Sequence, residues 1–190
     1  MAVRKILLYA EDEAALRRKS DPVHKANKRM QALIQDLKDT LMACPNGAGL
    51  AAPQINVHQR VVVVRLGLRD EDDDTAVIPT ALTNPEIMEA HDERRDFDGC
   101  LSFPGLYGTT HRPHYLKVKA LDETGHPVER VFEDFDAILV HHEIDHLDGV
   151  LFIDRIEQPQ DLYTIRRGAD GQLERVPLPD LLPMDKVNQR

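Results

Sequence analysis

Residues 142–146 read His-Glu-Ile-Asp-His, in the middle of the segment DFDAILVHHEIDHLD at residues 134–148. Asp134 can cap a helix there, and Gly149 stands where a left-handed residue commonly ends one. The remaining positions are largely apolar, apart from one polar stripe at i, i+4 and i+7 made by His141, Asp145 and Asp148. The pattern predicts a helix over residues 134–148 that lies in the core.

The two histidines of the H-E-x-x-H sequence are four residues apart. On a helix this spacing brings both imidazoles to one face, one turn apart, where they can bind one metal ion. Glu143 then points beside the metal, toward a bound water. The alternative is a core helix whose histidines are satisfied by hydrogen bonds. We interpret the sequence as a metal site, which needs a third ligand.

Candidates for the third ligand are few. A metzincin pattern needs histidine at position 152, which is Phe152, and a thermolysin-like pattern needs a carboxylate on a following helix, where only the loop-like Glu157 and Glu174 are available. Cys100 remains, because a thiolate with two imidazoles leaves a fourth coordination position for water. Taken alone, Cys100 is more simply a small buried hydrophobe, as we also interpret Cys44.

A small-residue segment, GAGLAAPQ at residues 47–54, is the third piece. Its glycines allow the backbone to pass close to a ligand, and Gln54 offers an amide donor that could stabilise a developing oxyanion. No strand pattern precedes the segment, and it lacks the Lys-Ser/Thr pair of a P-loop. Both nucleotide-binding interpretations are therefore excluded.

Taken together and in this order, three motifs resemble those of the peptide deformylase family. The family patterns G-x-G-L-A-A-x-Q, E-G-C-L-S and H-E-x-D-H-L-x-G are matched at residues 47–54, 98–102 and 142–149. The similarity covers about residues 5–156. The resemblance implies an α+β fold in which a long central helix that binds the metal is surrounded by antiparallel β-sheets.

The resemblance implies a metal-dependent hydrolase that removes the formyl group from the N-terminal formyl-methionine of newly synthesised polypeptides. One divalent ion, usually Fe²⁺ in the family, with Zn²⁺, Ni²⁺ or Co²⁺ as alternatives, is bound by Cys100, His142 and His146. Glu143 accepts a proton from the attacking water and later delivers one to the leaving amine. Charge on the former carbonyl oxygen is met by the metal, the Gln54 amide and the backbone N–H of Leu101.

The resemblance implies a formyl-methionyl nascent peptide as the substrate. Gly49 and Gly99 are expected to line its extended backbone. Three residues on the ligand face of the helix are expected to enclose the methionine side chain, with core packing as the alternative: Phe135, Ile138 and Leu139. A transient ribosome contact is a further expected partnership. The competing hypothesis is an inactive binding protein on the same fold, against which the presence of Glu143 and Gln54 argues.

Three residues depart from the family pattern. Asp98 replaces the usual glutamate, one methylene shorter, and is expected to pair with Arg112. His141 replaces a glutamine and is expected to be a solvated surface histidine rather than a fourth ligand. Ala48 replaces a bulkier aliphatic residue, which predicts a roomier side-chain pocket.

Composition and charge exclude several other classes of protein. With 33 acidic and 24 basic residues among 190, the net charge is −9, which argues against nucleic acid as a ligand. The longest apolar run, residues 61–64, is too short for a membrane span, and no targeting segment is evident, so a cytoplasmic location is expected. We expect one domain over residues 1–190, with its core at about 5–156 and an irregular, proline-containing tail at 157–190.

Other segments carry simpler signals. Residues 20–44 have apolar positions at helical spacing, and residues 59–66 read as a strand buried on both faces. An acidic loop is expected at residues 68–74. Further strands are expected at 81–88, 116–121 and 128–132, the last two joined by a turn at 122–125, and the tail supports at most a short hairpin at 169–171.

Overall fold

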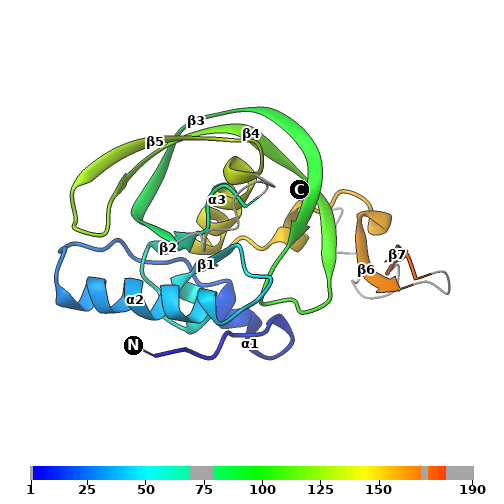
Figure 1. The fold of residues 1–190 in the computed structure, drawn as a ribbon, viewed down its shortest axis with the longest axis horizontal. Helices are drawn as coiled ribbons and strands as arrows, with labels where there is room; N and C mark the ends of the chain where they lie inside the picture. Colours follow the sequence, from blue (N-terminus) through cyan, green and yellow to red (C-terminus); the bar gives the residue numbers. More distant parts are fainter. Residues whose placement is uncertain (1, 69–78, 168–170, 179–190) are drawn as a thin grey trace.

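The structure is a computed structural model that describes residues 2–68, 79–167 and 171–178. Figure 1 shows a curled sheet wrapped around helix α3, with helix α2 on the far side of strands β1 and β2. Within the described residues, seven strands form one antiparallel sheet in the order β1-β2-β3-β4-β6-β7, and β5 pairs with β4. This arrangement is the expected α+β fold with a central helix.

Helix α3 (Asp134–Leu147) is the predicted central helix, and ten of its residues are buried. Its N-cap is Glu133 without a side-chain cap bond, so the expected capping by Asp134 is wrong. Asp134 instead adopts a positive φ of 48°. At the other end Gly149 has φ 74°, and a Cβ there would overlap the carbonyl oxygen of Arg17. The C-terminal prediction is therefore confirmed, with close approach as a second reason for glycine.

Strand β2 (Val61–Val64) separates two hydrophobic layers. Val62 and Val64 pack in a cluster with α3, while Val61 and Val63 pack in a cluster with helix α2 (Lys28–Met42). All four valines are fully buried, which explains the unbroken apolar run and confirms a strand buried on both faces. Strand β1 (Gly49–Ala51) pairs with β2 and places the small-residue segment beside α3.

Helix α2 begins later than its periodicity predicts. The expected helix over residues 20–44 is wrong in its first turns, because Asn27 is the N-cap and its side chain accepts hydrogen bonds from the N–H groups of Arg29 and Met30. A short helix, α1 (Tyr9–Leu16), precedes it and has no counterpart in the predicted elements.

Strands β3 (Thr80–Gly99) and β4 (Tyr107–Leu121) are much longer than the predicted segments 81–88 and 116–121. They pair from Thr83 to Gly99 with two register shifts. Strand β5 (Pro127–Glu133) pairs with β4 and confirms the hairpin at residues 122–125. The paired strands β3 and β4 form a long ribbon. Its end brings Asp98 against His142 and Cys100, just after β3, against His146 of α3.

The C-terminal segment contains more regular structure than expected. Strands β6 (Leu162–Arg167) and β7 (Leu173–Pro177) form an antiparallel hairpin, and β6 also pairs with β4. The chain has three short 3-10 turns: one after β1 at Ala52–Ile55, and two before β6 at Phe152–Arg155 and Pro159–Asp161. Strands β6 and β7 flank residues 169–171, so the short hairpin expected there is confirmed, although its strands make the tail more regular than expected. Residues 168–170, and most of the predicted acidic loop, lie outside the described residues. No described helix is long and apolar enough to cross a membrane.

The contact at Gly149 predicts a steric penalty beyond backbone strain. We expect Gly149→Ala to lower the free energy of unfolding by about 3 kcal/mol, because the new methyl group collides with the backbone of Arg17. Gly171→Ala is the matched control, since Gly171 also has positive φ but no atom of the described residues within 4 Å of its would-be Cβ, and should cost about 1 kcal/mol. Urea denaturation of both variants measures the difference, and equal losses would contradict the collision.

Candidate active site

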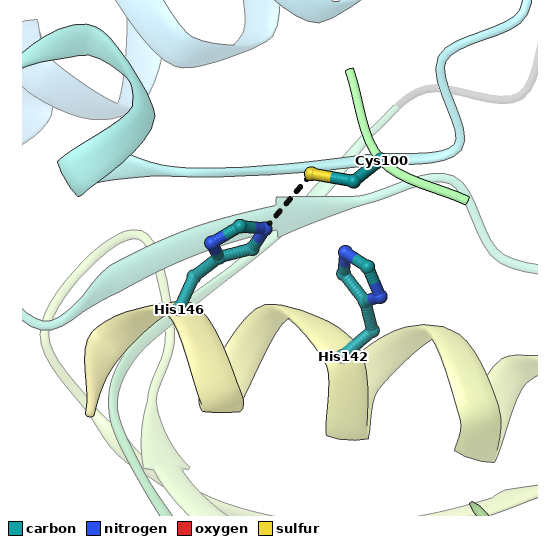
Figure 2. Close-up of side chains that lie close together, drawn as sticks. All are labelled: Cys100, His142 and His146. Atoms are coloured by element: carbon teal, nitrogen blue, oxygen red, sulfur yellow. Dashed lines mark hydrogen bonds between the residues drawn. The ribbon is translucent and has the colours of Figure 1, made fainter. Parts of the chain in front are cut away.

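Three potential metal ligands converge between the end of β3 and the middle of α3. Cys100 follows the last residue of β3, and His142 and His146 lie one turn apart on α3 (Figure 2). One ligand atom from each lies within 4.8 Å of the others, and Cys100 Sγ is 3.2 Å from His146 Nε2. Among the described residues no other such group of three His, Cys, Asp or Glu side chains occurs.

His142 is oriented by a carboxylate behind it. Its Nδ1 lies 2.7 Å from Asp98 Oδ1, so Nδ1 can carry the proton and leave the Nε2 lone pair for a metal. Burial lowers the pKa of His142, but the Asp98 carboxylate outweighs burial and raises this pKa well above its usual value. A metal ion at Nε2 would displace the proton from that nitrogen, while the Asp98 carboxylate keeps the proton on Nδ1.

His146 supplies the second imidazole in neutral form. Burial lowers its pKa to about 3, and its Nδ1 is buried without a hydrogen-bond partner among the described residues. A neutral imidazole is the form that coordinates a metal. The donor set of one thiol sulfur and two imidazoles, one of them held by a carboxylate, therefore fits a divalent metal ion.

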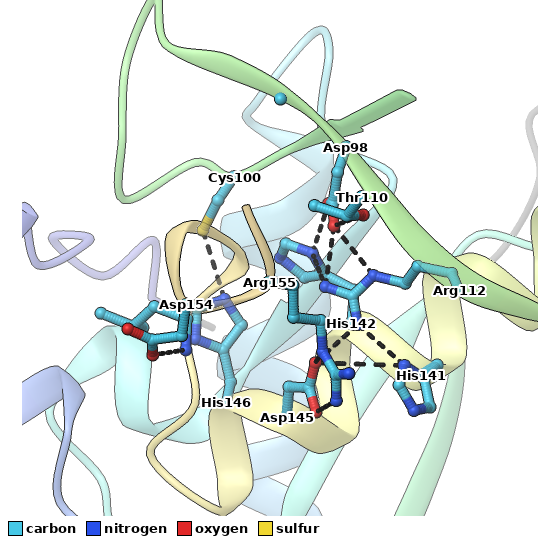
Figure 3. A network of polar contacts seen from close by, with 12 residues as sticks. Asp98, Cys100, Thr110, Arg112, His141, His142, Asp145, His146, Asp154 and Arg155 are labelled. Atoms are coloured by element: carbon cyan, nitrogen blue, oxygen red, sulfur yellow. Dashed lines mark hydrogen bonds and ion pairs between the residues drawn. The ribbon is translucent and has the colours of Figure 1, made fainter. Parts of the chain in front are cut away.

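Arg112 fixes the carboxylate that orients His142. This arginine is completely buried, and its Nε and Nη2 atoms lie 2.8 Å and 2.7 Å from Asp98 Oδ2 (Figure 3). Thr110 donates a further hydrogen bond of 2.9 Å to the same oxygen. Burial raises the pKa of Asp98, but His142 and Arg112 together hold it well below its usual value. The expected pairing of Asp98 with Arg112 is present.

His141 lies in this network instead of on the surface. Its side chain is 13% exposed, and Arg112 Nη1 donates to its Nδ1 over 2.8 Å. Burial lowers the pKa of His141 to about 4. The expectation of a solvated histidine is therefore wrong. A buried guanidinium has five N–H groups that need acceptors, and His141 and Asp145 provide two of them.

Glu143 follows His142 on α3, and its carboxylate faces strand β1 at Gly49. It is 3% exposed, and its Oε2 is buried without a hydrogen bond to any described residue. Burial raises the pKa of Glu143 to about 7, the range that suits an acid–base group at neutral pH. Its carboxylate lies directly against Gly49, where a Cβ would overlap it. This contact gives Gly49 a role that sequence reasoning missed.

Gln54 directs its amide nitrogen at Cys100. The Nε2 atom lies 3.5 Å from Cys100 Sγ and 3.2 Å from Ser102 Oγ, while Oε1 accepts from the backbone N–H of Ala51 over 2.8 Å. These contacts hold the amide in one orientation, with its donor toward the site. Ser102, which is 1% exposed, was not predicted, although it belongs to the DGCLS motif. Leu101 is half-buried against the α2 cluster.

The other residues predicted to bind substrate differ in their burial and contacts. Gly99 lies against the ring of Tyr107, and a Cβ built on Gly99 would be 3.0 Å from Cδ1 of that ring. Ile138 is buried and Phe135 is half-buried on α3. Leu139 belongs to the core cluster between α3 and the sheet, which favours the core-packing alternative for that residue.

This site defines a class of protein. A thiol and two imidazoles that converge on one point, beside a buried carboxylate with a near-neutral pKa and a fixed amide donor, are the functional groups of a metal-dependent hydrolase.

Comparison with known proteins identifies the family. The sequence model of the polypeptide deformylase family matches residues 3–161. Peptide deformylase 1 of Clostridium acetobutylicum is 40% identical over 160 residues, which are 84% of this chain and 99% of that protein. The peptide deformylase of Caldicellulosiruptor bescii is 44% identical over 156 residues, 82% of this chain and 87% of that protein.

Solved structures agree with the sequence comparison. A peptide deformylase from Legionella pneumophila superposes with a TM-score of 0.72 at 39% identity, covering 82% of this chain and 86% of that one. One from Ehrlichia chaffeensis, in complex with actinonin, has a TM-score of 0.74 at 30% identity, covering 83% and 91%. This chain belongs to the polypeptide deformylase family, whose members are metalloenzymes that hydrolyse the N-terminal formyl group.

The Arg112 network predicts that Asp98 contributes to stability and to metal binding together. We expect Asp98→Asn to lower the free energy of unfolding by about 3 kcal/mol, because it leaves a buried guanidinium without this counter-charge. We also expect about tenfold weaker zinc affinity, because His142 loses its orienting carboxylate. Chemical denaturation and competition with a chelator measure the two effects.

Asp36→Asn provides the control for this experiment. Asp36 pairs with Arg4 at 3.0 Å near the surface, far along the chain from the site, so its loss should cost less than about 1 kcal/mol and leave zinc affinity unchanged. Unchanged zinc affinity in Asp98→Asn would contradict an orienting role for Asp98.

Proposed function

We propose that this enzyme removes the formyl group from formyl-methionyl nascent peptides with one divalent metal ion bound by Cys100, His142 and His146. The observation that carries the proposal is the convergence of these three ligand atoms within 4.8 Å, on the helix that also carries Glu143, whose buried Oε2 has no hydrogen-bond partner among the described residues. We expect the reaction to take place in the cytoplasm, close to the ribosome that produces the substrate, through transient contact and without direct nucleic-acid binding.

The proposed metal is Fe²⁺, with Zn²⁺, Ni²⁺ or Co²⁺ as alternatives. A ligand set of one thiolate and two imidazoles suits these borderline ions and not the oxygen-seeking Mg²⁺ or Ca²⁺. When bound, such an ion supplies Lewis acidity that lowers the pKa of a water and polarises the formyl carbonyl.

Glu143 is the proposed acid–base residue. Its Oε2, which has no partner among the described residues, can accept the proton of the attacking water and later return a proton to the amine that leaves. The Gln54 Nε2–H and the backbone N–H of Leu101 are the proposed donors to the oxyanion. Gln54 is already oriented for this by its bond to Ala51, so no reorganisation is needed when charge develops.

Gly49 and Gly99 are proposed to line the extended backbone of the substrate, and Phe135 and Ile138 to form the wall around the methionine side chain, with Leu139 packed in the core behind them. Both glycines are flanked by site residues, Gly49 by Glu143 and Gly99 by Tyr107. A Cβ at Gly49 would overlap the Glu143 carboxylate, and one at Gly99 would lie 3.0 Å from the Tyr107 ring, so neither position has room for a side chain.

Substitution of Glu143 tests the mechanism. We expect Glu143→Gln to reduce kcat for release of formate from formyl-Met-Ala-Ser at least about 10³-fold, because an amide cannot accept the proton. Metal content should remain about one ion per chain. Glu89→Gln, at an exposed position that pairs with Lys117, should retain full activity. The measurement uses protein purified without oxygen.

Two outcomes would contradict the mechanism. Full turnover by Glu143→Gln would exclude Glu143 as the proton acceptor. Bound metal without formate release by the unmodified protein would instead favour an inactive binding protein on the same fold.

Ala48 is predicted to relax substrate selectivity. It is half-buried against the same cluster that contains Leu139, so its small side chain leaves space on that side of α3. We expect kcat/KM for formyl-methionyl peptides and for analogues with smaller first residues to be similar, well short of the roughly tenfold or greater loss per methylene of a closely fitting pocket. Steady-state kinetics on such a series checks this, and a strong preference for methionine would contradict it.

A further inference from the structure

The N-terminal segment before helix α1 forms hydrogen bonds with two turns of the active site. The N–H of Leu7 donates to the carbonyl of Gln54 over 2.8 Å, and the N–H of Tyr9 donates to the carbonyl of Ser102 over 3.0 Å. Gln54 lies in the 3-10 turn after β1. Ser102 lies in the turn at residues 100–103, after β3, which we call the Cys100 turn. Two residues of one segment therefore join the backbone of the Gln54 turn to that of the Cys100 turn.

The side chains of this segment pack against the same clusters as the Cys100 turn. Ile6 packs against the α2 cluster, as Leu101 does. Leu7 and Tyr9 pack against a third hydrophobic cluster, whose members lie mostly after α3, and Cys100 packs against it too. The N-terminal segment and the Cys100 turn are therefore held by one set of apolar contacts.

Tyr9 contacts the Cys100 turn with its ring as well as with its backbone. The ring stacks on that of Phe103, the last residue of the turn, with centroids 4.7 Å apart. Phe103 in turn lies edge-on to Phe152, at 5.1 Å. The Tyr9 hydroxyl donates to Glu13 Oε1 over 3.0 Å, which fixes the ring on α1. Tyr9 thus holds the turn by one hydrogen bond and one stacked ring.

The two turns meet at the Gln54 amide. Its Nε2 lies 3.5 Å from Cys100 Sγ and 3.2 Å from Ser102 Oγ, so both side-chain contacts span the gap that the N-terminal segment bridges with its backbone. Separation of the turns by about 1 Å would take both contacts beyond hydrogen-bond distance, and a shift of this size can cost an enzyme about 10²-fold in rate.

We propose that the backbone N–H of Tyr9 is a positioning group of the active site, which sets the distance between the Cys100 turn and Gln54 through the Ser102 carbonyl. Its effect on turnover rests on the proposed function, whereas its effect on metal binding rests only on Cys100 as a ligand. The N–H acts through the turn and not on the substrate. Its loss is therefore expected to lower kcat and metal affinity and to leave KM unchanged.

Substitution of Tyr9 by proline removes this N–H and suits the local backbone. Tyr9 is the first residue of α1, where proline is favoured, and Leu8 has φ −105° and ψ 136°, a conformation that commonly precedes proline. Tyr9→Ala is the matched control, because it loses the same ring but keeps the N–H. We expect the zinc affinity and the kcat of Tyr9→Pro to be about tenfold below those of Tyr9→Ala, with equal KM for formyl-Met-Ala-Ser.

Two further variants separate positioning from stability. Thr40→Val removes the hydrogen bond that the N–H of Arg4 gives to Thr40 Oγ1 over 2.9 Å, where the same segment meets α2. It should lower the free energy of unfolding and leave zinc affinity unchanged. Tyr9→Phe keeps both the N–H and the ring, and should restore the zinc affinity and kcat of the unmodified protein.

Competition with a chelator measures the zinc affinities without any turnover. Equal zinc affinities in Tyr9→Pro and Tyr9→Ala, or a loss in Thr40→Val as large as that in Tyr9→Pro, would overturn the proposal. Failure of the proposed function has a different signature, because no protein in the series, the unmodified one included, would then release formate, whereas the difference in zinc affinity would remain.

Discussion

The buried charge of Arg112 is the constraint on which the site depends. A guanidinium without exposure to solvent must keep its counter-charges, because an unpaired charge in the interior costs several kcal/mol. Asp98 at the end of β3 and Asp145 on α3 supply these charges, at 2.7 Å and 2.5 Å. The end of the β3–β4 ribbon is therefore fixed relative to α3. His142, which contacts Asp98, and Cys100, which follows Asp98 by two residues, are held in place with it.

The same packing explains how an ordinary glutamate becomes an acid–base group. Glu143 shares α3 with both histidines but faces the small-residue strand β1, where Gly49 allows its carboxylate to approach the backbone. No described residue neutralises its Oε2, and burial raises its pKa to about 7. In contrast, Asp98 is equally buried but ionised, because Arg112 and His142 surround it. Their different surroundings give Glu143 a raised pKa that suits acid–base chemistry and keep Asp98 a charged carboxylate that orients His142.

Local patterns predicted the parts of the molecule whose environment is uniform. Most of the apolar helix α3 and all of the valine strand at 61–64 are buried, so both show nearly continuous apolar sequence. Most of β3 escaped prediction because residues 88–95 are exposed and charged, without apolar alternation, and are held by pairing with β4. The burial of His141 follows from the acceptors that Arg112 needs, a contact between residues 29 apart that no local pattern contains.

The central claim is that one sulfur and two imidazole nitrogens bind the metal. X-ray absorption spectroscopy of the zinc-loaded protein tests it most directly. The account predicts one Zn–S distance of about 2.3 Å and two Zn–N distances of about 2.0–2.1 Å, with the sulfur contribution absent in Cys100→Ser. A shell of nitrogen and oxygen alone, or a sulfur signal that persists in Cys100→Ser, would contradict the account.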